Sequence, residues 1–292
     1  MLNVSSLGEF GLIGFIQKNL QVSPKVIRGI GDDTAVLSYT KDKYLLFTTD
    51  MMAEGGHFTR QMPLELIGRK ALGCNISDIA AMGGLPTFAV VSIGVPKDTP
   101  VRFIEEIYKG MQSLAKDFNV SIVGGDTIKS EQMIINVALL GEVEKKYLVT
   151  RDGARPLDWI FVSGPLGGSL KSAKHLTFIP CVEEARFLVQ NFKPSAMMDI
   201  SDGLAGDLNH ILKASQVGAK LWMDMIPLAP QSSQEQALSD GEDFELLFTL
   251  SPLKAKRLLD WQDKHKRWFF YPIGQITKNK KQTIHAKSFT HF

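Results

Sequence analysis

Carboxylates follow apolar runs at several places in this chain, and these are the residues that could perform chemistry. In residues 44–50 an apolar run ends in two threonines and Asp50. Two further segments, 120–126 and 197–203, repeat this arrangement. A buried carboxylate is costly unless its charge is compensated, so several strand ends of this kind indicate a shared site. Divalent metal ions are the simplest compensating charge, because hard cations prefer oxygen ligands.

The elements that must position these carboxylates are predicted to be a mixture of strands and helices. The predicted strands are 35–37, 44–49, 88–95, 120–123, 133–141, 159–163, 196–200, 219–224 and 244–250. The predicted helices are 8–20, 63–82, 99–118, 203–216 and 252–265, with further helical segments in 168–190. The turn-rich stretch 149–158 predicts a boundary between two domains, 1–149 and 150–292.

Composition excludes several classes of protein. The 292 residues are 44% apolar and carry a net charge of +2, which favours neither nucleic acid nor membrane as a partner. There is no apolar run of about eighteen residues, and residues 1–6 lack the basic start and apolar core of a signal peptide. A cytoplasmic location is therefore expected. Cys74 and Cys181 lie far apart without a CxxC or Cys/His cluster, so neither a disulfide framework nor a zinc site is indicated.

Two familiar nucleotide-binding signatures are missing. The chain has no GxxxxGK[ST], and residues 164–169 do not give GxGxxG. The glycine-rich loop after Ser163 could cradle a phosphate, but its glycines alone favour a plain strand-to-helix turn. If a nucleotide binds, carboxylates acting through metal ions must do much of the work of a phosphate-binding loop.

Eight short motifs occur in order along nearly the whole chain. They are GEF at 8–10, GIGDD at 29–33, TTD at 48–50 with His57 after it, NISDIAAMGG at 75–84, GGDT at 124–127, TRDGARP at 150–156, DISDGL at 199–204 and GEDFEL at 241–246. A single motif such as GGD is a weak signal. Together the eight resemble the thiamine-monophosphate kinase family, which belongs to the superfamily of aminoimidazole ribonucleotide synthetase and selenophosphate synthetase.

The resemblance implies an α/β (α+β) fold of the aminoimidazole ribonucleotide synthetase type, with two domains. Its N-terminal sheet would form a homodimer, and the active site would lie in the cleft between the domains. The implied reaction transfers the γ-phosphoryl group of ATP to the phosphate of thiamine monophosphate, giving thiamine diphosphate, with several Mg²⁺ ions assisting.

The resemblance also assigns roles by motif position. The implied magnesium ligands are Asp33, Thr48, Thr49, Asp50, Asp78, Asp126, Asp199 and Asp202. The implied ATP contacts are Gly125, Asp126, Arg151, Ser201 and Tyr108. The thiamine substrate would contact His57, Glu242 and Phe289.

The reaction requires no general base from the protein. A phosphate monoester loses its second proton with a pKa near 6, so the attacking phosphate is already largely ionised at neutral pH. Catalysis would then consist of positioning and charge neutralisation, as in other phosphoryl transfers. We predict direct in-line transfer without a phosphoenzyme.

Each candidate also has a simpler structural interpretation. Asp32 and Asp33 could form an ordinary turn after glycine. Asp202 could cap the helix that follows it. His57 could be a surface histidine, and Glu242 could be a charge at a strand edge.

Two alternative functions stay open. One is another ATP-dependent enzyme of the same superfamily with a different substrate, such as the selenophosphate or aminoimidazole ribonucleotide branch. The selenium branch needs a reactive cysteine near the N-terminus, and the first 73 residues contain none. The other is a catalytically silent scaffold that binds nucleotide or metal, against which the full set of carboxylates argues.

Overall fold

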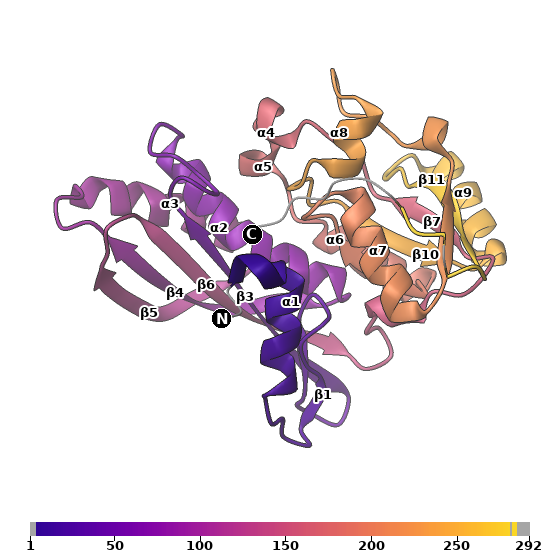
Figure 1. The fold of residues 1–292 in the computed structure, drawn as a ribbon, viewed down its shortest axis with the longest axis horizontal. Helices are drawn as coiled ribbons and strands as arrows, with labels where there is room; N and C mark the ends of the chain where they lie inside the picture. The colour runs from indigo at the N-terminus through magenta and orange to yellow at the C-terminus, as the bar shows by residue number, and fades with distance from the viewer. Residues whose placement is uncertain (1–3, 281, 285–292) are drawn as a thin grey trace.

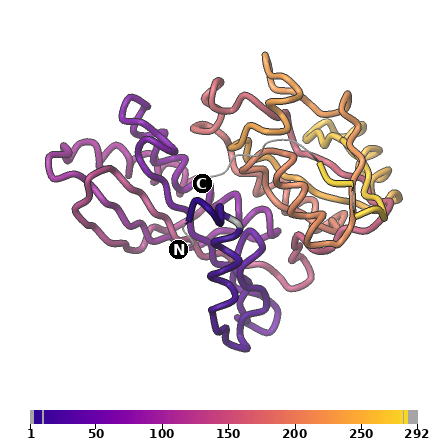
Figure 2. The backbone as a smooth tube through the Cα atoms, in the orientation of Figure 1, coloured from indigo at the N-terminus to yellow at the C-terminus, as the bar shows by residue number. Residues whose placement is uncertain are grey.

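Two α/β halves, each built around one sheet, make up the computed structural model, which describes residues 4–280 and 282–284 (Figure 1). The backbone trace shows the N-terminal half and the C-terminal half as two lobes side by side (Figure 2). This confirms the predicted two-domain α/β fold. The predicted boundary lies between the last strand of the first sheet and the first strand of the second, and the exact division at 149/150 stays a prediction.

The first sheet has the strand order β1-β2-β3-β6-β4-β5. Its strands are β1 (Val26–Arg28), β2 (Ala35–Ser38), β3 (Lys43–Ala53), β4 (Leu85–Val95), β5 (Ser121–Lys129) and β6 (Ile134–Glu144). Only the β4–β5 pair is parallel among the described pairs of this sheet. The helices of this half are α1 (Val4–Lys18), α2 (Leu64–Ala81) and α3 (Val101–Asp117).

One face of the first sheet is covered by α2, which contacts β3, β4 and β6, and α3 packs against α2. The two helices approach closely through glycines. A Cβ added to Gly68 would lie 1.8 Å from the carbonyl oxygen of Ile107, and one added to Gly110 would lie 1.8 Å from that of Glu65. The absence of side chains at these two positions therefore sets the distance between the helices.

Gly110→Ala should lower the free energy of unfolding by roughly 3 kcal/mol, because the helices must separate to admit the methyl group. The matched control is Gly14→Ala on α1, where an added Cβ meets nothing within 4 Å. The control should be neutral or slightly stabilising. Urea denaturation of both variants measures the difference, and equal stabilities would contradict the close helix contact.

The opposite face of the first sheet has no covering helix among the described residues (Figure 1). Side chains alternate along β3, so that Leu46 and Thr48 are buried under α2 while Phe47 is 44% exposed on the other side. Phe47 pairs with Leu140, which pairs with Phe88, and this forms an apolar row across three strands. We call this surface the open face; its members are Phe47, Thr49, Met51, Phe88, Val90, Ser92, Asp126, Asn136, Ala138 and Leu140.

The prediction that the carboxylates stand at strand ends is wrong for two of the three segments. β3 continues three residues past Asp50, and β5 is a largely exposed edge strand that continues past Asp126. The expectation came from parallel α/β sheets, where ligands gather at the carboxyl ends of strands, but this sheet is mostly antiparallel. Asp199 does stand at a strand end, as the last residue of β8.

The second sheet has the order β8-β10-β7-β11-β9, and its described pairs are antiparallel. Its strands are β7 (Trp159–Val162), β8 (Ala196–Asp199), β9 (Gly218–Leu221), β10 (Leu246–Leu250) and β11 (Tyr271–Thr277). The helices of this half are α4 (Ser169–Ser172), α5 (Lys174–Thr177), α6 (Val182–Asn191), α7 (Leu204–Ser215), α8 (Gln234–Ser239) and α9 (Pro252–His265), with 3-10 turns η1 (Arg151–Gly153) and η2 (Met223–Met225). β1, α8 and β11 were not predicted from the sequence.

A shared apolar core joins the two halves. α2 contacts α5, α6 and β8 of the second half (Figure 1). Buried residues of α2 such as Ile76 belong to the same cluster as Leu188 of α6 and Phe248 of β10. One face of α2 therefore packs on the first sheet while another lies against the C-terminal half. Within the described residues, no helix combines the length and apolar character needed to cross a membrane.

Candidate active site

A pocket of about 230 Å³ lies where α2 meets the C-terminal half. Both halves contribute to it, and most of its lining is polar or charged. The lining residues are Glu9, Asp50, Met51, Met52, His57, Lys70, Cys74, Asp78, Asp199, Ser201, Asp202, Glu242 and Phe244. Seven of the residues that the sequence assigned to substrates or metal thus line one cavity: Asp50, His57, Asp78, Asp199, Ser201, Asp202 and Glu242.

Three carboxylates form a cluster beside this pocket, and those of Asp78 and Asp199 line it. Oxygen atoms of Asp33, Asp78 and Asp199 all lie within 4.8 Å of one another. Thr48 Oγ1 donates to Asp78 Oδ2 at 2.5 Å, and Ser77 Oγ donates to Asp199 Oδ2 at 2.6 Å. These hydroxyls fix the carboxylates of Asp78 and Asp199. The three acids come from distant parts of the chain: Asp33 from the loop before β2, Asp78 from α2 and Asp199 from β8.

Burial, and after it the crowding of these acids, raises their pKa values. Burial, and then the charges of Asp50, Asp199 and Asp33, raises the pKa of Asp78 well above its ordinary value. Burial and the charge of Asp33 raise the pKa of Asp199 to about 7, while burial and the charge of Asp202 raise that of Asp50 to about 6. Two unit charges 4 Å apart repel by about 4 kcal/mol at an effective dielectric of 20. The site therefore favours a cation.

Arg151 compensates part of this charge. Its Nη2 pairs with Asp33 Oδ1, and its Nε lies 3.8 Å from Asp32 Oδ1. The Asp32 carboxylate also accepts the backbone N–H of Arg151, at 3.3 Å to Oδ1. Burial, followed by the charge of Asp33, raises the pKa of Asp32 to about 7. The two aspartates therefore do more than form a turn, and Asp32 joins the site although the sequence did not assign it a role.

A divalent cation fits the three-acid cluster by the chemistry of its donors. The cluster offers carboxylate oxygens and no sulfur, which suits Mg²⁺. Asp33 Oδ2 is buried and has no hydrogen-bond partner among the described residues, so an oxygen in the cluster is left for a further ligand. One arginine cannot balance the several carboxylates gathered here.

α2 presents three pocket residues on one face. Lys70, Cys74 and Asp78 follow one another at intervals of four, which places them one above the other along the helix. Asn75, which was expected to share the side of Asp78, is fully buried and donates to the carbonyl oxygen of Ala71 instead. Burial raises the pKa of the Cys74 thiol well above its ordinary value, so this cysteine is protonated at neutral pH and is a poor nucleophile.

The loop between β8 and α7 is fixed by an aspartate that the sequence did not single out. Asp207 Oδ2 accepts the backbone N–H groups of Ser201 and Asp202 at 3.1 Å each. Burial raises the pKa of Asp207 well above its ordinary value. Oxygens of Asp202 and Asp207 also lie within 4.8 Å of a ring nitrogen of His210. Asp207 therefore shapes the turn that carries Ser201 and Asp202, and Gly203 rather than Asp202 stands at the cap position of α7.

Five predicted site residues lie away from this pocket or outside the described residues. Thr49 and Asp126 are exposed on the open face, opposite to Asp78, and Gly125 lies beside Asp126 on β5. Tyr108 is half-buried on α3 and packs against the core. Phe289 lies outside the described residues. The roles of these five residues stay predictions.

The glycine-rich loop 164–168 is a structural turn. Two of its glycine amide groups are already occupied, because Gly167 N donates to Asp243 Oδ2 at 2.9 Å and Gly168 N donates to Asp240 Oδ2 at 3.1 Å. An anion would have to displace both carboxylates. This agrees with the plain strand-to-helix turn that the sequence favoured.

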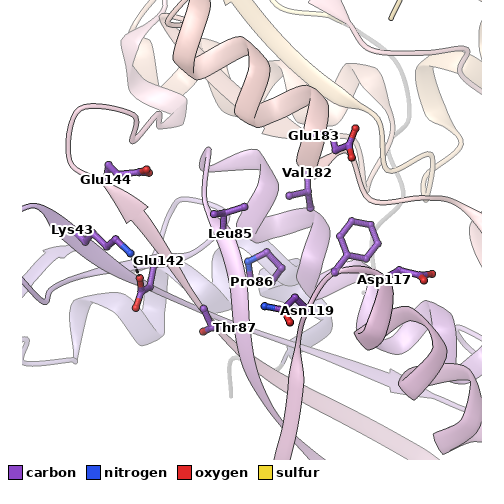
Figure 3. Close-up of a pocket in the computed structure, with 11 residues that line it drawn as sticks. Lys43, Leu85, Pro86, Thr87, Asp117, Asn119, Glu142, Glu144, Val182 and Glu183 are labelled. Carbon is purple, nitrogen blue, oxygen red and sulfur yellow. Dashed lines mark hydrogen bonds and ion pairs between the residues drawn. The ribbon is translucent and has the colours of Figure 1, made fainter. Parts of the chain in front are cut away.

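A second cavity, of about 400 Å³, lies on another side of the junction between the halves (Figure 3). Leu85, Pro86 and Thr87 at the start of β4 face Val182 and Glu183 of α6 across it. Three of its four acids have basic partners, since Glu142 pairs with Lys43, Glu144 with Arg186 and Glu183 with Arg267. This cavity therefore lacks the uncompensated charge of the first pocket.

The raised pKa values predict that the metal-free protein is more stable at pH 6.5 than at pH 8. Asp32 and Asp199 have folded pKa values of about 7 against an ordinary 3.8, so the folded state binds more protons than the unfolded chain in this window. The free energy of unfolding should therefore rise by roughly 1 kcal/mol as the pH falls from 8 to 6.5. Below that range half-buried His210, whose pKa is lowered to about 4 mainly by desolvation, acts in the opposite direction.

Thermal unfolding at the two pH values, with EDTA and with MgCl₂, measures this effect. Mg²⁺ should raise the melting temperature more at pH 8, where protons do not compete for the carboxylates. A metal-free melting temperature that rises with pH over this window would contradict the clustering of the acids.

The sequence of this chain matches known protein families and relatives along most of its length. Residues 31–143 match the family described as AIR synthase related protein, N-terminal domain, and residues 167–287 match the corresponding C-terminal domain. The thiamine-monophosphate kinase of Aquifex aeolicus is 38% identical over 324 residues, covering 100% of both chains. That of Bacillus subtilis is 35% identical over 274 residues, covering 84% of each chain.

Solved structures similar to this chain support the same family. The structure described as AaThiL complexed with AMPPCP and TMP superimposes with a TM-score of 0.88 at 33% identity, covering 100% of this chain and 99% of the other. Thiamine-monophosphate kinase from Stenotrophomonas maltophilia gives a TM-score of 0.76 at 29% identity and covers 96% of both chains. The chain therefore belongs to the thiamine-monophosphate kinase family of AIR synthase related proteins.

Proposed function

We propose that this protein transfers the γ-phosphoryl group of ATP to the phosphate of thiamine monophosphate in the pocket beside α2. The observation that carries the proposal is the convergence of Asp33, Asp78 and Asp199, from three distant parts of the chain, on one buried cluster. The relative whose structure is described as a complex with AMPPCP and TMP supports ATP and thiamine monophosphate as the two substrates.

Attacking and transferred groups are both anionic phosphates, so neutralising their charge is the main catalytic requirement. Asp33, Asp78 and Asp199, with Asp50 and Asp202 beside them, would hold Mg²⁺, which when bound neutralises phosphate charge and orients the phosphates. Arg151 fixes Asp33 from the side of η1. The Thr48 and Ser77 hydroxyls hold the other carboxylates in place.

Direct in-line transfer is the mechanism that these residues support. The acceptor phosphate is largely ionised at neutral pH and needs no protein base. The pocket thiol of Cys74 is protonated, which removes the strongest nucleophile of the pocket as a carrier of the phosphoryl group. Incubation with γ-labelled ATP alone should leave no label on the protein. A stable labelled protein would contradict direct transfer.

The substrate side of the pocket would be formed by His57 and Glu242. Both line the pocket, and Phe244 beside Glu242 gives it an aromatic surface. The Phe244 ring is held by stacking on Phe178, with ring centroids 4.1 Å apart. A cationic heterocycle such as the thiazolium of thiamine would find a carboxylate and an aromatic face at this end.

The open face supports a homodimer. Phe47, Met51 and Phe88 are 44%, 62% and 52% exposed there, which is unusual for large apolar side chains on a regular sheet. A second copy packed against the same face would bury them in an isologous contact. Predicted ATP residue Asp126 also lies on this face, which places it at the proposed dimer contact.

An ADP-release assay tests the proposed function. With ATP and MgCl₂, thiamine monophosphate should produce ADP and thiamine diphosphate in equal amounts. Thiamine, which lacks the acceptor phosphate, should produce neither, and EDTA should stop the reaction. ADP release that does not depend on thiamine monophosphate would contradict the substrate assignment.

A further inference from the structure

Lys70 is a buried lysine in the middle of α2 whose side chain is 1% exposed. A buried ammonium group is costly unless charge and hydrogen bonds compensate it. Lys70 Nζ donates to Glu242 Oε1 at 2.5 Å and to the His57 carbonyl oxygen at 3.1 Å. The first partner belongs to the C-terminal half and the second to the loop after β3. One ammonium group therefore connects the two residues proposed to contact the thiamine substrate.

The backbone of Glu242 is fixed independently of Lys70. Its N–H donates to the Ser201 carbonyl oxygen at 2.6 Å, and Ser169 Oγ donates to its carbonyl oxygen at 2.6 Å. Its φ of 63° is a left-handed conformation that non-glycine residues rarely adopt. These contacts leave the direction of the carboxylate to be set by its ion pair with Lys70.

The His57 loop is fixed in a complementary way. Ala53 N donates to His57 Nδ1 at 3.2 Å, which orients the ring and places the ring proton of the neutral form on Nε2. Lys70 holds the carbonyl group of the same residue. One side chain of α2 therefore contacts both the His57 carbonyl group and the Glu242 carboxylate.

We propose that Lys70 is a positioning residue that sets the geometry of His57 and Glu242 and thereby controls affinity for the thiamine substrate. The proposal rests on the proposed function, because that function makes these two residues substrate contacts. The residues proposed on the ATP side, Arg151 and Asp33, pair with each other and not with Lys70. Loss of Lys70 should therefore affect the two substrates unequally.

Lys70→Met removes the charge and keeps a side chain of similar length. The KM for thiamine monophosphate should rise roughly tenfold or more, because its contacts lose their mutual orientation. The KM for ATP should stay within about twofold. The matched control is Lys109→Met. Lys109 also pairs with a glutamate, Glu65 of α2, but its side chain is 70% exposed. Neither KM should change in the control.

Three further variants, Lys70→Arg, Glu242→Gln and the two combined, keep the test decisive if Lys70→Met does not fold. Lys70→Arg keeps the charge and changes its position, so the KM for thiamine monophosphate should still rise selectively. Glu242→Gln combined with Lys70→Arg should raise this KM by less than the product of the single effects, since both act through one ion pair. Equal changes in the KM values for ATP and for thiamine monophosphate would overturn the role of Lys70. A combined variant whose KM for thiamine monophosphate rises by the full product of the single effects would overturn it as well. A wild-type protein that does not phosphorylate thiamine monophosphate would instead overturn the proposed function itself.

Discussion

Asp78→Asn should reduce turnover by roughly a thousandfold while the protein folds normally. Asp78 lies in the centre of the acid cluster, with its pKa raised by burial and by the charges of Asp50, Asp199 and Asp33. Asparagine has the same shape, and its Oδ1 can still accept the hydrogen bond from Thr48. The substitution therefore removes a metal ligand charge with little change in packing.

The same variant should be more stable than wild type without metal. Removing one of several clustered carboxylates relieves repulsion that the folded state otherwise bears. Melting curves with EDTA and steady-state turnover with MgCl₂ measure the two effects on the same preparation. Asp98→Asn, in an exposed loop between β4 and α3, is the control and should change neither. Wild-type turnover in Asp78→Asn would remove this residue from the metal site.

Phe88→Glu should convert the proposed homodimer into monomers of 32.4 kDa. Phe88 is 52% exposed and lies in the apolar row with Leu140 and Phe47 on the open face. Two copies packed through this face would bury two glutamates against apolar side chains, which costs several kcal/mol for each charge. Sedimentation or light scattering measures the mass.

Turnover of the Phe88→Glu monomer should also fall. Asp126 lies on β5, three strands from β3, or roughly 14 Å at ordinary strand spacing. It also faces away from Asp78, so we expect any role of Asp126 in ATP binding to depend on a second chain packed against the open face. Leu253→Glu, at a 73% exposed apolar position on α9, is the matched control. A fully active Phe88→Glu monomer would show that contact between two open faces is not needed for turnover.

The sequence predicted best those features that depend on local pattern. α2 and α9 were expected within one or two residues of their observed ends, because proline starts, a glycine stop and apolar spacing are visible in short windows. Asp78, Asp199 and Asp202 were assigned to one site, and they line one pocket. The order of the motifs carried this information where a single motif would not.

Features that depend on pairing over long distances were not predictable. Asp126 was expected beside Asp50, but the face on which a strand residue points depends on its register with β4 and β6. The burial of Lys70 could not be predicted from its position on a helix, because it depends on an ion pair with Glu242, which is 172 residues away in the chain. Asp32 gained its role in the same way, through Arg151, which is 119 residues away in the chain.

The central claim is that Asp33, Asp78 and Asp199 hold a divalent cation between the two halves of the protein. Crystals grown with Mn²⁺ and a non-hydrolysable ATP analogue, with data collected at the manganese edge, test it directly. The account predicts an anomalous peak roughly 2.0–2.2 Å from oxygens of these three carboxylates and in contact with the analogue's phosphates. Manganese bound elsewhere, with the three carboxylates bound to neither metal nor nucleotide, would contradict it.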